Sequence, residues 1–599
     1  CGSALTAPAI GDPQPEPRGT PRPLDERKLA TVLFADVVGL TSLAERTDPE
    51  LVARIVDAAF KDLGDVVNEH GGTIDKYMGD SVMAVFGVPV AHDDDAERAV
   101  AAALAIKHLG GDLVFSIGIN SGEVMSTSVG RGDVTVIGDT VNVAARFEKA
   151  AAPGEVLCGR LTTELAGESV VFRPRQPVLL KGKSGPVEVW EAVSLRERWA
   201  RQAGDDVPLV GRGTELAFLE AQWRRARDDG QQSLLILCGE AGSGKTRLLN
   251  EIERAVGPES IVVRSAYPGY GAMGGARIAG EIIAQLGTSR DPEVDARVRS
   301  VTGEIDDSLK SIDPPALHQE QVWAFGRLIK EKAKDEVLVI MIDDMHRGDD
   351  LTLELLAEVD SRLSNISMLT VLAGRTDPGE WLQRFQTATT LRLSPLGHAE
   401  ATALADGFVK DRPLTAGASD LLVELSGGNP LYLRELVSMA RARGMLVEDG
   451  GRFRLESHTG IPATLQALLA ARLDALDPAQ KQVIQLTSVL GEATAEQIVD
   501  LGASGASVIL EQLVASGLLA RGPGERYRAA DSLMREVAYE MLPRNVRGQL
   551  HRRSADLVTR PEDRARHLGQ AARYLDGDES VSTEAAEALE EVGQAFIEA

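Results

Sequence analysis

Residues 71–87 read GGTIDKYMGDSVMAVFG, and the first part of the chain is best understood from this stretch. Its two apolar segments are strand-like, and Gly79-Asp80 between them is a turn pair. A further strand, in ATVLFADVV at 30–38, carries Asp36 after its apolar run. Carboxylates at strand ends can meet in space, where their hard oxygen atoms suit Mg²⁺ or Mn²⁺. Taken singly, each aspartate is more often a turn or cap residue.

A helix is predicted over about residues 49–70, between these strands. Asp48 is a favourable N-cap, Pro49 suits the first helical position, and Gly71-Gly72 ends the segment. The apolar side chains recur on one face, namely Leu51, Val52, Ile55, Val56, Ala59, Phe60 and Leu63. Strands and helices continue to alternate up to about Leu195, which predicts an α/β unit.

Six ordered motifs between residues 28 and 195 resemble the catalytic domain of class III nucleotidyl cyclases. They read FADVVGLTSLAE, GGTIDKYMGDSVMAVFG, SIGINSGEV, TVIGDTVNVAARFE, PGEVL and LLKGKSGPVEVWEAV. Leu40 stands where the family commonly has Phe, which is a change of packing. The resemblance implies a ferredoxin-like α+β domain that converts ATP into 3′,5′-cyclic AMP and pyrophosphate.

The same resemblance implies roles for six side chains: Asp36 and Asp80 bind two metal ions, Mg²⁺ or Mn²⁺, Lys76 and Thr135 read the base, and Asn142 and Arg146 act on the transition state. In this family the aspartates come from one protomer and the other four residues from its partner. A chain that carries the whole set is therefore expected to form a homodimer with two equivalent sites.

The residue types fit this chemistry. The ammonium group of Lys76 can donate to N1 of adenine, whereas N1 of guanine carries a proton. Lys76 therefore favours ATP, and Thr135 can accept from the adenine amino group. Asn142 and Arg146 are four residues apart and share one helix face. Arg146 can then stabilise charge on the α-phosphate while the ribose 3′-hydroxyl attacks.

A second phosphate-binding motif, GEAGSGKT, spans residues 239–246, after the strand LLIL and before the helix RLLNEIERAV. This is the context that a P-loop requires. The loop amides from Gly239 to Gly244 would cradle the phosphates of ATP. Lys245 would reach the β- and γ-phosphates, and Thr246 would hold Mg²⁺. Farther along, VLVIMIDD ends a buried strand in Asp343-Asp344, a Walker B pattern.

The order of these motifs over about residues 208–560 resembles STAND-type signalling ATPases, which are relatives of AAA proteins. The supporting residues are LVGRGTEL at 209–216, Arg375 as the sensor arginine, and Pro430 in GGNPLYLREL near the nucleotide. The segments IPATLQALLAARLDALDP and MREVAYEMLP resemble the helical and winged-helix parts. Arg347-Gly348 replace a Trp-Ala pair of the family, so nucleotide binding is the firmer expectation and ATP hydrolysis an additional one.

Composition and these resemblances predict six segments. They are a disordered linker at 1–27, the cyclase domain at 28–195, a linker at 196–207, the P-loop ATPase domain with a parallel sheet at 208–395, a helical and winged-helix part at 396–560, and the start of TPR-like helical repeats at 561–599. Strand signals nearly vanish after about residue 395. Cys1 suggests a truncated zinc ribbon or, less readily, a lipid-modified N-terminus, and we expect the chain to be a piece of a longer protein.

Acidic residues outnumber basic ones by 90 to 64, giving a formal net charge of −26 at pH 7. This field repels nucleic acid and anionic lipid, so neither is expected as a partner. The longest apolar runs, such as VLVIMI at 337–342, are far shorter than the roughly 20 residues of a membrane helix. Three cysteines are too few for a disulfide framework and fit the cytoplasm, with Cys158 and Cys238 as small buried side chains.

Two further signals favour structural explanations. His92 with Asp93, Asp94 and Asp95 is better explained as a helix cap than as a metal site. The basic segment RNVRGQLHRR at 544–553 is expected to be a solvated helix face rather than a nucleic-acid site. A protein partner is expected for the C-terminal helical region.

The leading hypothesis is an adenylyl cyclase that acts in intracellular signalling and is regulated by the fused ATP-binding module, with the two sites binding ATP independently. The first alternative is an ATP-dependent signalling scaffold whose cyclase domain is inactive and only dimerises or senses nucleotide. The second is a transcriptional regulator, because some relatives end in a DNA-binding helix-turn-helix.

Overall fold

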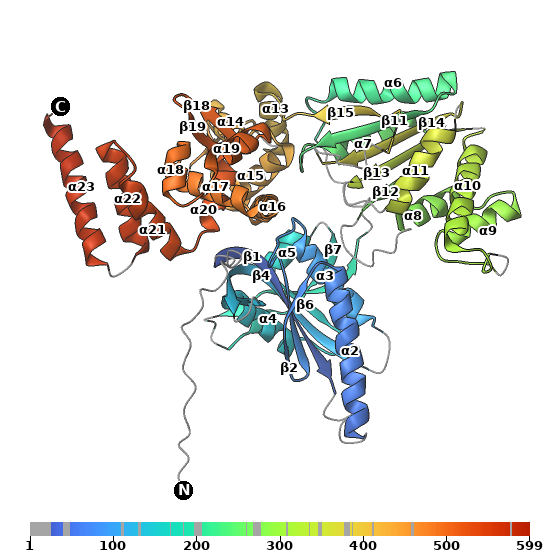
Figure 1. Cartoon of the computed structure of the whole chain (residues 1–599), viewed down its shortest axis with the longest axis horizontal. Coiled ribbons are helices and arrows are strands. Elements are labelled where there is room, and N and C mark those ends of the chain that lie inside the picture. The colour runs from blue at the N-terminus through green and yellow to red at the C-terminus, as the bar shows by residue number, and fades with distance from the viewer. Residues whose placement is uncertain are drawn as a thin grey trace, which may run out of the picture.

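The computed structural model describes residues 25–39, 48–109, 113–129, 133–167, 169–181, 183, 185–196, 207–258, 260–267, 277–306, 309–334, 336–345, 350–363, 365–375, 384–385, 387–409, 412–456, 461–575 and 578–598. We name the described residues 25–196 the N-terminal unit, 207–393 the middle unit and 396–598 the C-terminal unit. The N-terminal unit lies below the other two, which lie side by side (Figure 1).

The N-terminal unit is built on one mixed sheet with strand order β2-β3-β1-β4-β6-β10-β7, and β5 pairs with β4. The strands are β1 (Glu26–Val38), β2 (Thr73–Met78), β3 (Ser81–Phe86), β4 (Val114–Val129), β5 (Asp133–Ile137), β6 (Val156–Gly159), β7 (Val170–Pro174) and β10 (Val189–Leu195), with a separate hairpin of β8 (Val178–Leu179) and β9 (Pro186–Val187). The helices are α2 (Pro49–Glu69), α3 (Asp95–Lys107), α4 (Asp139–Ala150) and α5 (Arg160–Ala166). The order β1-α2-β2-β3-α3-β4, with β1 between β3 and β4, is ferredoxin-like.

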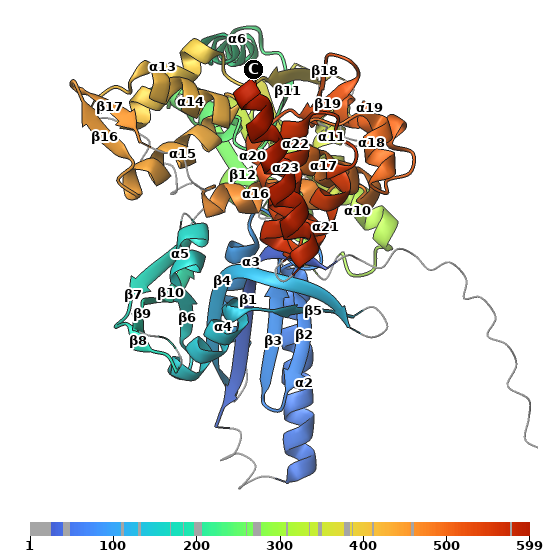
Figure 2. The same cartoon turned by 90° about the vertical axis from the view of Figure 1, so that its left-hand side faces the viewer.

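The central strand β1 is buried on both faces, because successive side chains of a strand point to opposite sides. Leu33 and Ala35 belong to the core that includes Leu63 of α2 and Ala99 of α3. Val32 and Phe34 belong to the opposite cluster, which includes Ala144 of α4. Figure 2 shows α2 and α4 separated by the sheet. The strand that ends near Asp36 is therefore held between two layers of helices.

Gly118 of β4 allows α4 to approach the sheet closely. A Cβ atom at this position would overlap with the backbone of Ala144, Phe147 and Glu148. The glycine is needed for this approach of two backbones, since its φ lies outside the left-handed region. It therefore fixes the distance between α4 and the strands that carry the other candidate residues.

The two predictions of helix starts had different outcomes. The helix predicted over about 49–70 is confirmed as α2, and Asp48 accepts a hydrogen bond from the Glu50 amide at 2.9 Å. The capping function predicted for His92–Asp95 is wrong in detail: Asp94 is at the N-cap position of α3, but its side chain makes no capping bond. The Asp94 carboxylate accepts a hydrogen bond from Arg98 instead, and the Asp95 carboxylate accepts one from the His92 amide at 2.7 Å.

The middle unit contains the expected parallel sheet, in the order β12-β13-β14-β11-β15. Its strands are β11 (Ser233–Gly239), β12 (Ser260–Ala266), β13 (Val337–Asp343), β14 (Met368–Gly374) and β15 (Thr389–Leu393). Its helices are α6 (Gly213–Asp229), α7 (Lys245–Val256), α8 (Arg277–Leu286), α9 (Pro292–Ser300), α10 (Pro314–Lys332) and α11 (Asp350–Arg362). Ile236 faces the cluster with α8, α10 and α11, and Leu235 faces the cluster with α6 and α7. Helices thus cover both faces, as a parallel sheet requires.

The C-terminal unit is mainly helical, which confirms the helical periodicity. Its helices are α13 (His398–Val409), α14 (Ala416–Ser426), α15 (Pro430–Ala442), α16 (Ala463–Asp474), α17 (Pro478–Leu490), α18 (Ala495–Asp500), α19 (Ala506–Ala515), α20 (Ser532–Glu540), α21 (Arg544–Ala555), α22 (Pro561–Tyr574) and α23 (Glu579–Glu598). Two short hairpins, β16 (Leu446–Asp449) with β17 (Arg452–Leu455) and β18 (Leu519–Gly522) with β19 (Arg526–Ala529), were not predicted. Each has only four-residue strands, too short to show a clear alternation.

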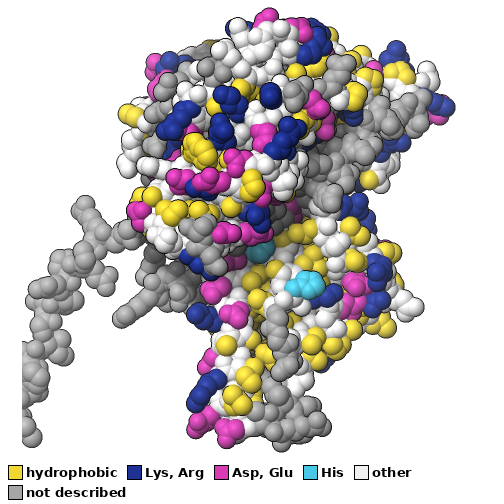
Figure 3. Space-filling model, turned by 90° about the vertical axis from the view of Figure 1, so that its right-hand side faces the viewer, with side chains coloured by type: hydrophobic (Ala, Val, Ile, Leu, Met, Phe, Trp, Pro, Cys, Tyr) yellow, Lys and Arg dark blue, Asp and Glu magenta, His cyan; other side chains and the backbone are white. Residues whose placement is uncertain are grey.

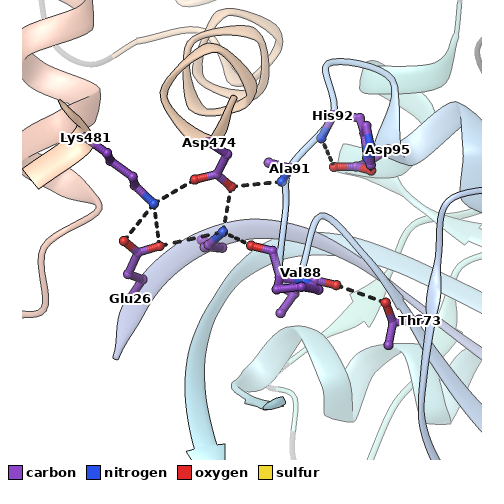
Figure 4. A network of polar contacts seen from close by, with 10 residues as sticks. Glu26, Thr73, Val88, Ala91, His92, Asp95, Asp474 and Lys481 are labelled. Carbon is purple, nitrogen blue, oxygen red and sulfur yellow. Dashed lines mark hydrogen bonds and ion pairs between the residues drawn. The ribbon is translucent and has the colours of Figure 1, made fainter. Parts of the chain in front are cut away.

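The N-terminal and C-terminal units meet through a buried cluster of four charges (Figure 4). Asp474, at the end of α16, accepts from Lys28 of β1 at 2.6 Å and from Lys481 of α17 at 2.7 Å. Lys481 also lies 2.7 Å from Glu26, at the start of β1. The Ala91 amide donates to Asp474 at 2.9 Å, and Ala91 belongs to the apolar core of the C-terminal unit. These contacts tie β1 and the segment before α3 to the helical unit.

The basic helix α21 is solvated only in part: Arg544 and Arg553 are exposed, as the sequence suggests, but other side chains of the helix are buried. Arg547 is 7% exposed and donates to the carbonyls of Glu540 and Leu542. These carbonyls lie at and just beyond the end of α20, where carbonyl groups have no hydrogen-bond partner within the helix. His551 is buried too, with its Nε2 atom 2.8 Å from the Tyr539 hydroxyl and its Nδ1 atom 2.8 Å from Nδ1 of His567. Burial is the main cause that lowers the pKa of His551 to about 3 and that of His567 to about 4.

Gly118→Ala should destabilise the N-terminal unit by about 1–3 kcal/mol, because α4 must move away from β4 to admit the methyl group. Urea unfolding followed by circular dichroism measures the change. Gly185→Ala is the matched control, since a Cβ atom there meets nothing within 4 Å. Equal stability of the two variants would contradict the close approach.

The buried histidines predict acid sensitivity of the C-terminal unit. Their folded-state pKa values lie below the ordinary 6.5, so the unfolded chain binds protons first as the pH falls. The stability contributed by the neutral rings is complete above pH 6.5 and declines from there toward pH 4. The melting temperature of the parent should fall more between pH 7 and pH 5 than that of the His551→Gln/His567→Gln variant. The exposed His398, changed to Gln, serves as the control and should behave like the parent.

Candidate functional site

The structure brings Asp36 and Asp80 together, as the strand ends predict. Asp36 lies near the end of β1 and Asp80 in the turn between β2 and β3, and the Val37 amide donates to the Asp80 carbonyl at 3.1 Å. Burial raises the pKa of Asp36, and the nearby Asp80 carboxylate raises it further. Asp36 is half-buried and Asp80 is exposed, and two carboxylates that repel each other favour a bound cation.

Glu148 of α4 is a third acidic side chain in this region, and the sequence analysis missed its importance. Its residue is only 7% exposed. Burial, followed by the charges of Asp36 and Asp80, raises the pKa of Glu148 to about 7. The sequence could have indicated Glu148 as a candidate site residue, since it lies two residues after Arg146 in the motif TVNVAARFE. Glu148 therefore adds to the negative potential at pH values above neutral.

The two aspartates fit a divalent metal ion. Within the residues that the structure describes, no Lys, Arg or His lies in ion-pair contact with Asp36 or Asp80. The same part of the chain contains no group of three or more His, Cys, Asp or Glu side chains placed to bind one ion. One or two carboxylates completed by substrate phosphates are the usual environment of Mg²⁺ in phosphoryl-transfer sites. Asp36 and Asp80 would hold the metal in this way.

Lys76 and Thr135 lie on β2 and β5, and these two strands contact each other. The Lys76 side chain is 45% exposed and pairs with Asp75 at 3.0 Å. Thr135 pairs with Thr127 of β4, whereas Asp36 pairs with Ser116 of the same strand. Eleven residues of β4 separate these two positions along the strand. Thr135 and Asp36 of one chain therefore lie beside different parts of β4.

Asn142 and Arg146 lie one turn apart on α4, on the expected common face. Val143, Ala144 and Phe147 of this helix are buried, while Asn142 is exposed and Arg146 is half-buried. Neither of the two polar side chains has a hydrogen bond or ion pair to another described residue. Both are thus available to a ligand that comes from outside the unit.

The P-loop follows β11 and has the geometry that its glycines predict. Gly242 and Gly244 have φ values of +78° and +96°, and Gly244 directly precedes α7. The buried Lys245 donates to the carbonyls of Gly239 and Glu240 at 3.0 and 2.9 Å. Its ammonium group therefore lies inside the curve of the loop, where phosphate oxygens would replace the two carbonyls.

Thr246, directly after Lys245, is in contact with the Walker B residue Asp343. Thr246 Oγ1 donates to Asp343 at 2.6 Å, and the Asp344 amide donates to Asp343 at 2.9 Å. Burial raises the pKa of Asp343, and Asp344 adds to the effect. A hydroxyl and a buried carboxylate in contact are the donor set that Mg²⁺ uses beside a P-loop. The Arg347-Gly348 pair lies outside the described residues.

Arg375 follows β14 directly, next to the P-loop strand. The register pairs Gly374 with Cys238, so Arg375 is level with Gly239. Burial lowers the pKa of Lys245, Asp343 and Asp344 oppose this, and the charge of Arg375 lowers it further. Arg375 thus belongs to the electrostatic environment of the P-loop lysine; its role as a sensor arginine stays a prediction.

Pro430 begins α15 at the P-loop. The side chain of its neighbour Asn429 donates to the Ala241 carbonyl at 2.9 Å, and the Leu431 amide donates to the Gly242 carbonyl at 3.3 Å. Two further arginines were not predicted for this site. Buried Arg212, in the motif LVGRGTEL, donates to the Ser243 carbonyl at 3.2 Å, and Arg472 of α16 pairs with Glu240 of the loop at 2.9 Å.

Two parts of the chain match known protein families. Residues 24–192 match the family described as the adenylate and guanylate cyclase catalytic domain, and residues 208–371 match the AAA ATPase domain. The protein therefore joins a class III nucleotidyl cyclase domain to an AAA-type ATPase domain. The helical C-terminal unit follows them.

The relatives cover different parts of the chain. An uncharacterized protein of Rhizobium meliloti is 26% identical over 96% of this chain, which spans 60% of that protein's length. Adenylate cyclase 1 of the same organism is 32% identical over 28% of this chain and 28% of its own length. The crystal structure of the adenylyl cyclase CyaB from P. aeruginosa is 31% identical, with a TM-score of 0.28 over 29% of this chain and 98% of that one.

Among the described residues, none of the helices combines the length and the apolar composition needed to cross a membrane.

Asp36→Asn and Asp80→Asn should each weaken Mn²⁺ binding to the N-terminal unit by at least about tenfold, because each removes one of two carboxylates that face the ion. Isothermal titration calorimetry measures the affinity. Asp139→Asn is the control, since that exposed carboxylate pairs with Lys183 at 2.6 Å. Unchanged Mn²⁺ binding by a folded Asp36→Asn protein would remove Asp36 from the metal site.

Proposed function

We propose that the protein is an adenylyl cyclase that converts ATP into 3′,5′-cyclic AMP and pyrophosphate in the cytoplasm, under the control of its ATP-binding module. The observation that carries this proposal is the Asp36–Asp80 carboxylate pair within a domain of the cyclase family. The similarity to proteins named adenylate cyclase supports it.

Each candidate residue has a defined task in this reaction. Asp36 and Asp80 would hold two Mg²⁺ or Mn²⁺ ions, which would lower the charge on the phosphates and activate the 3′-hydroxyl. Arg146 stabilises the charge that develops on the α-phosphate as pyrophosphate leaves. Asn142, one turn earlier on α4, orients the ribose. Glu148, when ionised, strengthens the field that retains the metal ions.

The active form is a homodimer with composite sites. The eleven residues of β4 between the partners of Asp36 and Thr135 support this, because within one chain the two groups lie beside different parts of that strand. The edge strand β2 carries exposed Tyr77 and Met78, and Ile137 at the end of β5 is 62% exposed. Figure 3 shows hydrophobic side chains gathered on one face of the lower, N-terminal unit. A second copy would cover such apolar surface.

The ATPase module binds ATP and Mg²⁺ through Lys245, Thr246 and Asp343, and it acts as the regulatory part. Helices α17 to α19 followed by the β18–β19 hairpin support a winged-helix element in the C-terminal unit. The antiparallel helices α21, α22 and α23 support the start of a helical repeat that binds a protein partner.

The composite site predicts complementation between two inactive chains. Asp36→Ala and Arg146→Ala proteins should each form almost no cyclic AMP from ATP and Mn²⁺. Mixed together, they should regain up to about a quarter of the parent activity, because half of the dimers are then mixed and each has one intact site. Absence of rescue, with mixed dimers shown by differential tagging, would contradict the composite site.

If Lys76 reads the base, reversing the charge at this position should change the preference for ATP over GTP. The parent should use ATP strongly in preference to GTP, and Lys76→Glu should reduce the ratio of kcat/KM values by at least about tenfold, because a carboxylate accepts from guanine N1–H where an ammonium group cannot. Steady-state assays with both nucleotides measure the ratio. The exposed Lys183→Glu variant is the control, and equal use of ATP and GTP by the parent would overturn the adenylyl assignment.

A further inference from the structure

A partly exposed ion pair links the N-terminal unit to the P-loop site. Asp93, in the segment before α3, accepts from Arg375 at 2.9 Å, across 282 positions in the sequence. Asp95 holds this segment in shape through the His92 amide, and the Asp474–Ala91 bond holds its other end. Asp93 is therefore presented to the middle unit by a segment that is fixed on both sides.

Arg375 stands between Asp93 and the P-loop. It follows β14 at the level of Gly239, and its charge lowers the pKa of Lys245, to which burial contributes most. The ammonium group of Lys245 lies inside the loop, so the terminal phosphate of a bound triphosphate would come close to Arg375 as well. The guanidinium group of Arg375 can therefore pair with either of two anions, the Asp93 carboxylate or the terminal phosphate.

The Lys28–Asp474 and Asp93–Arg375 pairs differ in accessibility. The Lys28–Asp474 pair is 5% and 2% exposed, whereas the Arg375 and Asp93 side chains are 39% and 22% exposed. A partly hydrated pair is easily exchanged for a more highly charged anion, since it gains little from a low-dielectric environment. The Asp474 cluster is therefore the fixed anchor, and the Asp93–Arg375 pair is the contact that can open.

We propose that Asp93 is a positioning residue of the P-loop site, contributed by the cyclase domain. It holds Arg375 away from the nucleotide and competes with the terminal phosphate of a nucleoside triphosphate for the guanidinium group. A diphosphate lacks that phosphate and leaves the pair intact. The inference rests on the proposed ATP binding at Lys245. It goes beyond that proposal because it makes a residue of the cyclase domain set the relative affinity of the P-loop site for nucleoside tri- and diphosphates.

The test compares nucleotide affinities of the full chain carrying Asp36→Ala, so that no cyclic product forms. Titration calorimetry with a non-hydrolysable ATP analogue and with ADP gives two affinities, and Lys245→Ala identifies the part that belongs to the P-loop. Asp93→Asn should tighten binding of the analogue at least about fivefold and that of ADP less than twofold. A residue with a merely structural role would change both affinities alike.

Three matched variants sharpen the result. Asp93→Glu keeps the charge and should bind like the parent, and so should Asp94→Asn, whose carboxylate pairs with Arg98 inside the N-terminal unit. In an Arg375→Gln background, Asp93→Asn should change the affinity ratio less than twofold. An unchanged analogue-to-ADP ratio in Asp93→Asn, or the same change in Asp94→Asn, would overturn the proposal.

Two failures are distinguishable in this experiment. If the parent shows no Lys245-dependent binding, the proposed ATP site itself fails and Asp93 has nothing to compete with. If Lys245-dependent binding is present and Asp93→Asn leaves the ratio unchanged, only the role of Asp93 fails. Should Asp93→Asn unfold, Asp93→Ser replaces it, and thermal melting of each variant establishes that the chain is folded.

Discussion

The buried carboxylate of Asp474 is the group on which the arrangement of the two nucleotide sites depends. Burial alone would raise its pKa, but the ammonium groups of Lys28 and Lys481 outweigh burial and lower it. Removing one member of such a cluster leaves the remaining buried charges unbalanced, and breaking a buried ion pair in this way costs about 3–5 kcal/mol. The cluster therefore stabilises one particular docking of β1 on α16 and α17 against others.

The strand β1 connects this docking to the proposed chemistry. Glu26 and Lys28 at its start belong to the interface, and Asp36 near its end belongs to the proposed metal site. Hydrogen bonds to β3 and β4 and apolar layers on both faces make the strand rigid along this length. On the other side, the same last turn of α16 places Arg472 on the P-loop residue Glu240. The strand β1 and the helix α16 thus connect the Asp36 site and the P-loop site to the same cluster around Asp474.

The sequence predicts those parts of the sites that local structure determines. Asp36 and Asp80 follow from a strand end and a turn, and Lys245 and Thr246 follow from one loop and the start of one helix. Glu148 and Arg212 lie within the motifs quoted above, but a motif does not show that they are buried. The burial of Glu148 depends on the packing of α4 on Gly118, and that of Arg212 on its contact with the Ser394 carbonyl. The Asp93–Arg375 pair joins two motifs 282 residues apart, so no local pattern could predict it.

Independent binding of ATP at the two sites was expected because a linker separates the two modules. The contacts of Asp93 and Asp474 change that expectation, since both modules share an interface that includes a P-loop arginine. Binding free energies are reciprocal: if nucleotide at Lys245 favours release of Asp93, any state of the cyclase domain that moves Asp93 must alter the affinity at Lys245 by the same factor. Dimerisation or metal binding at Asp36 would then be sensed by the ATPase module, and regulation would run in both directions between the sites.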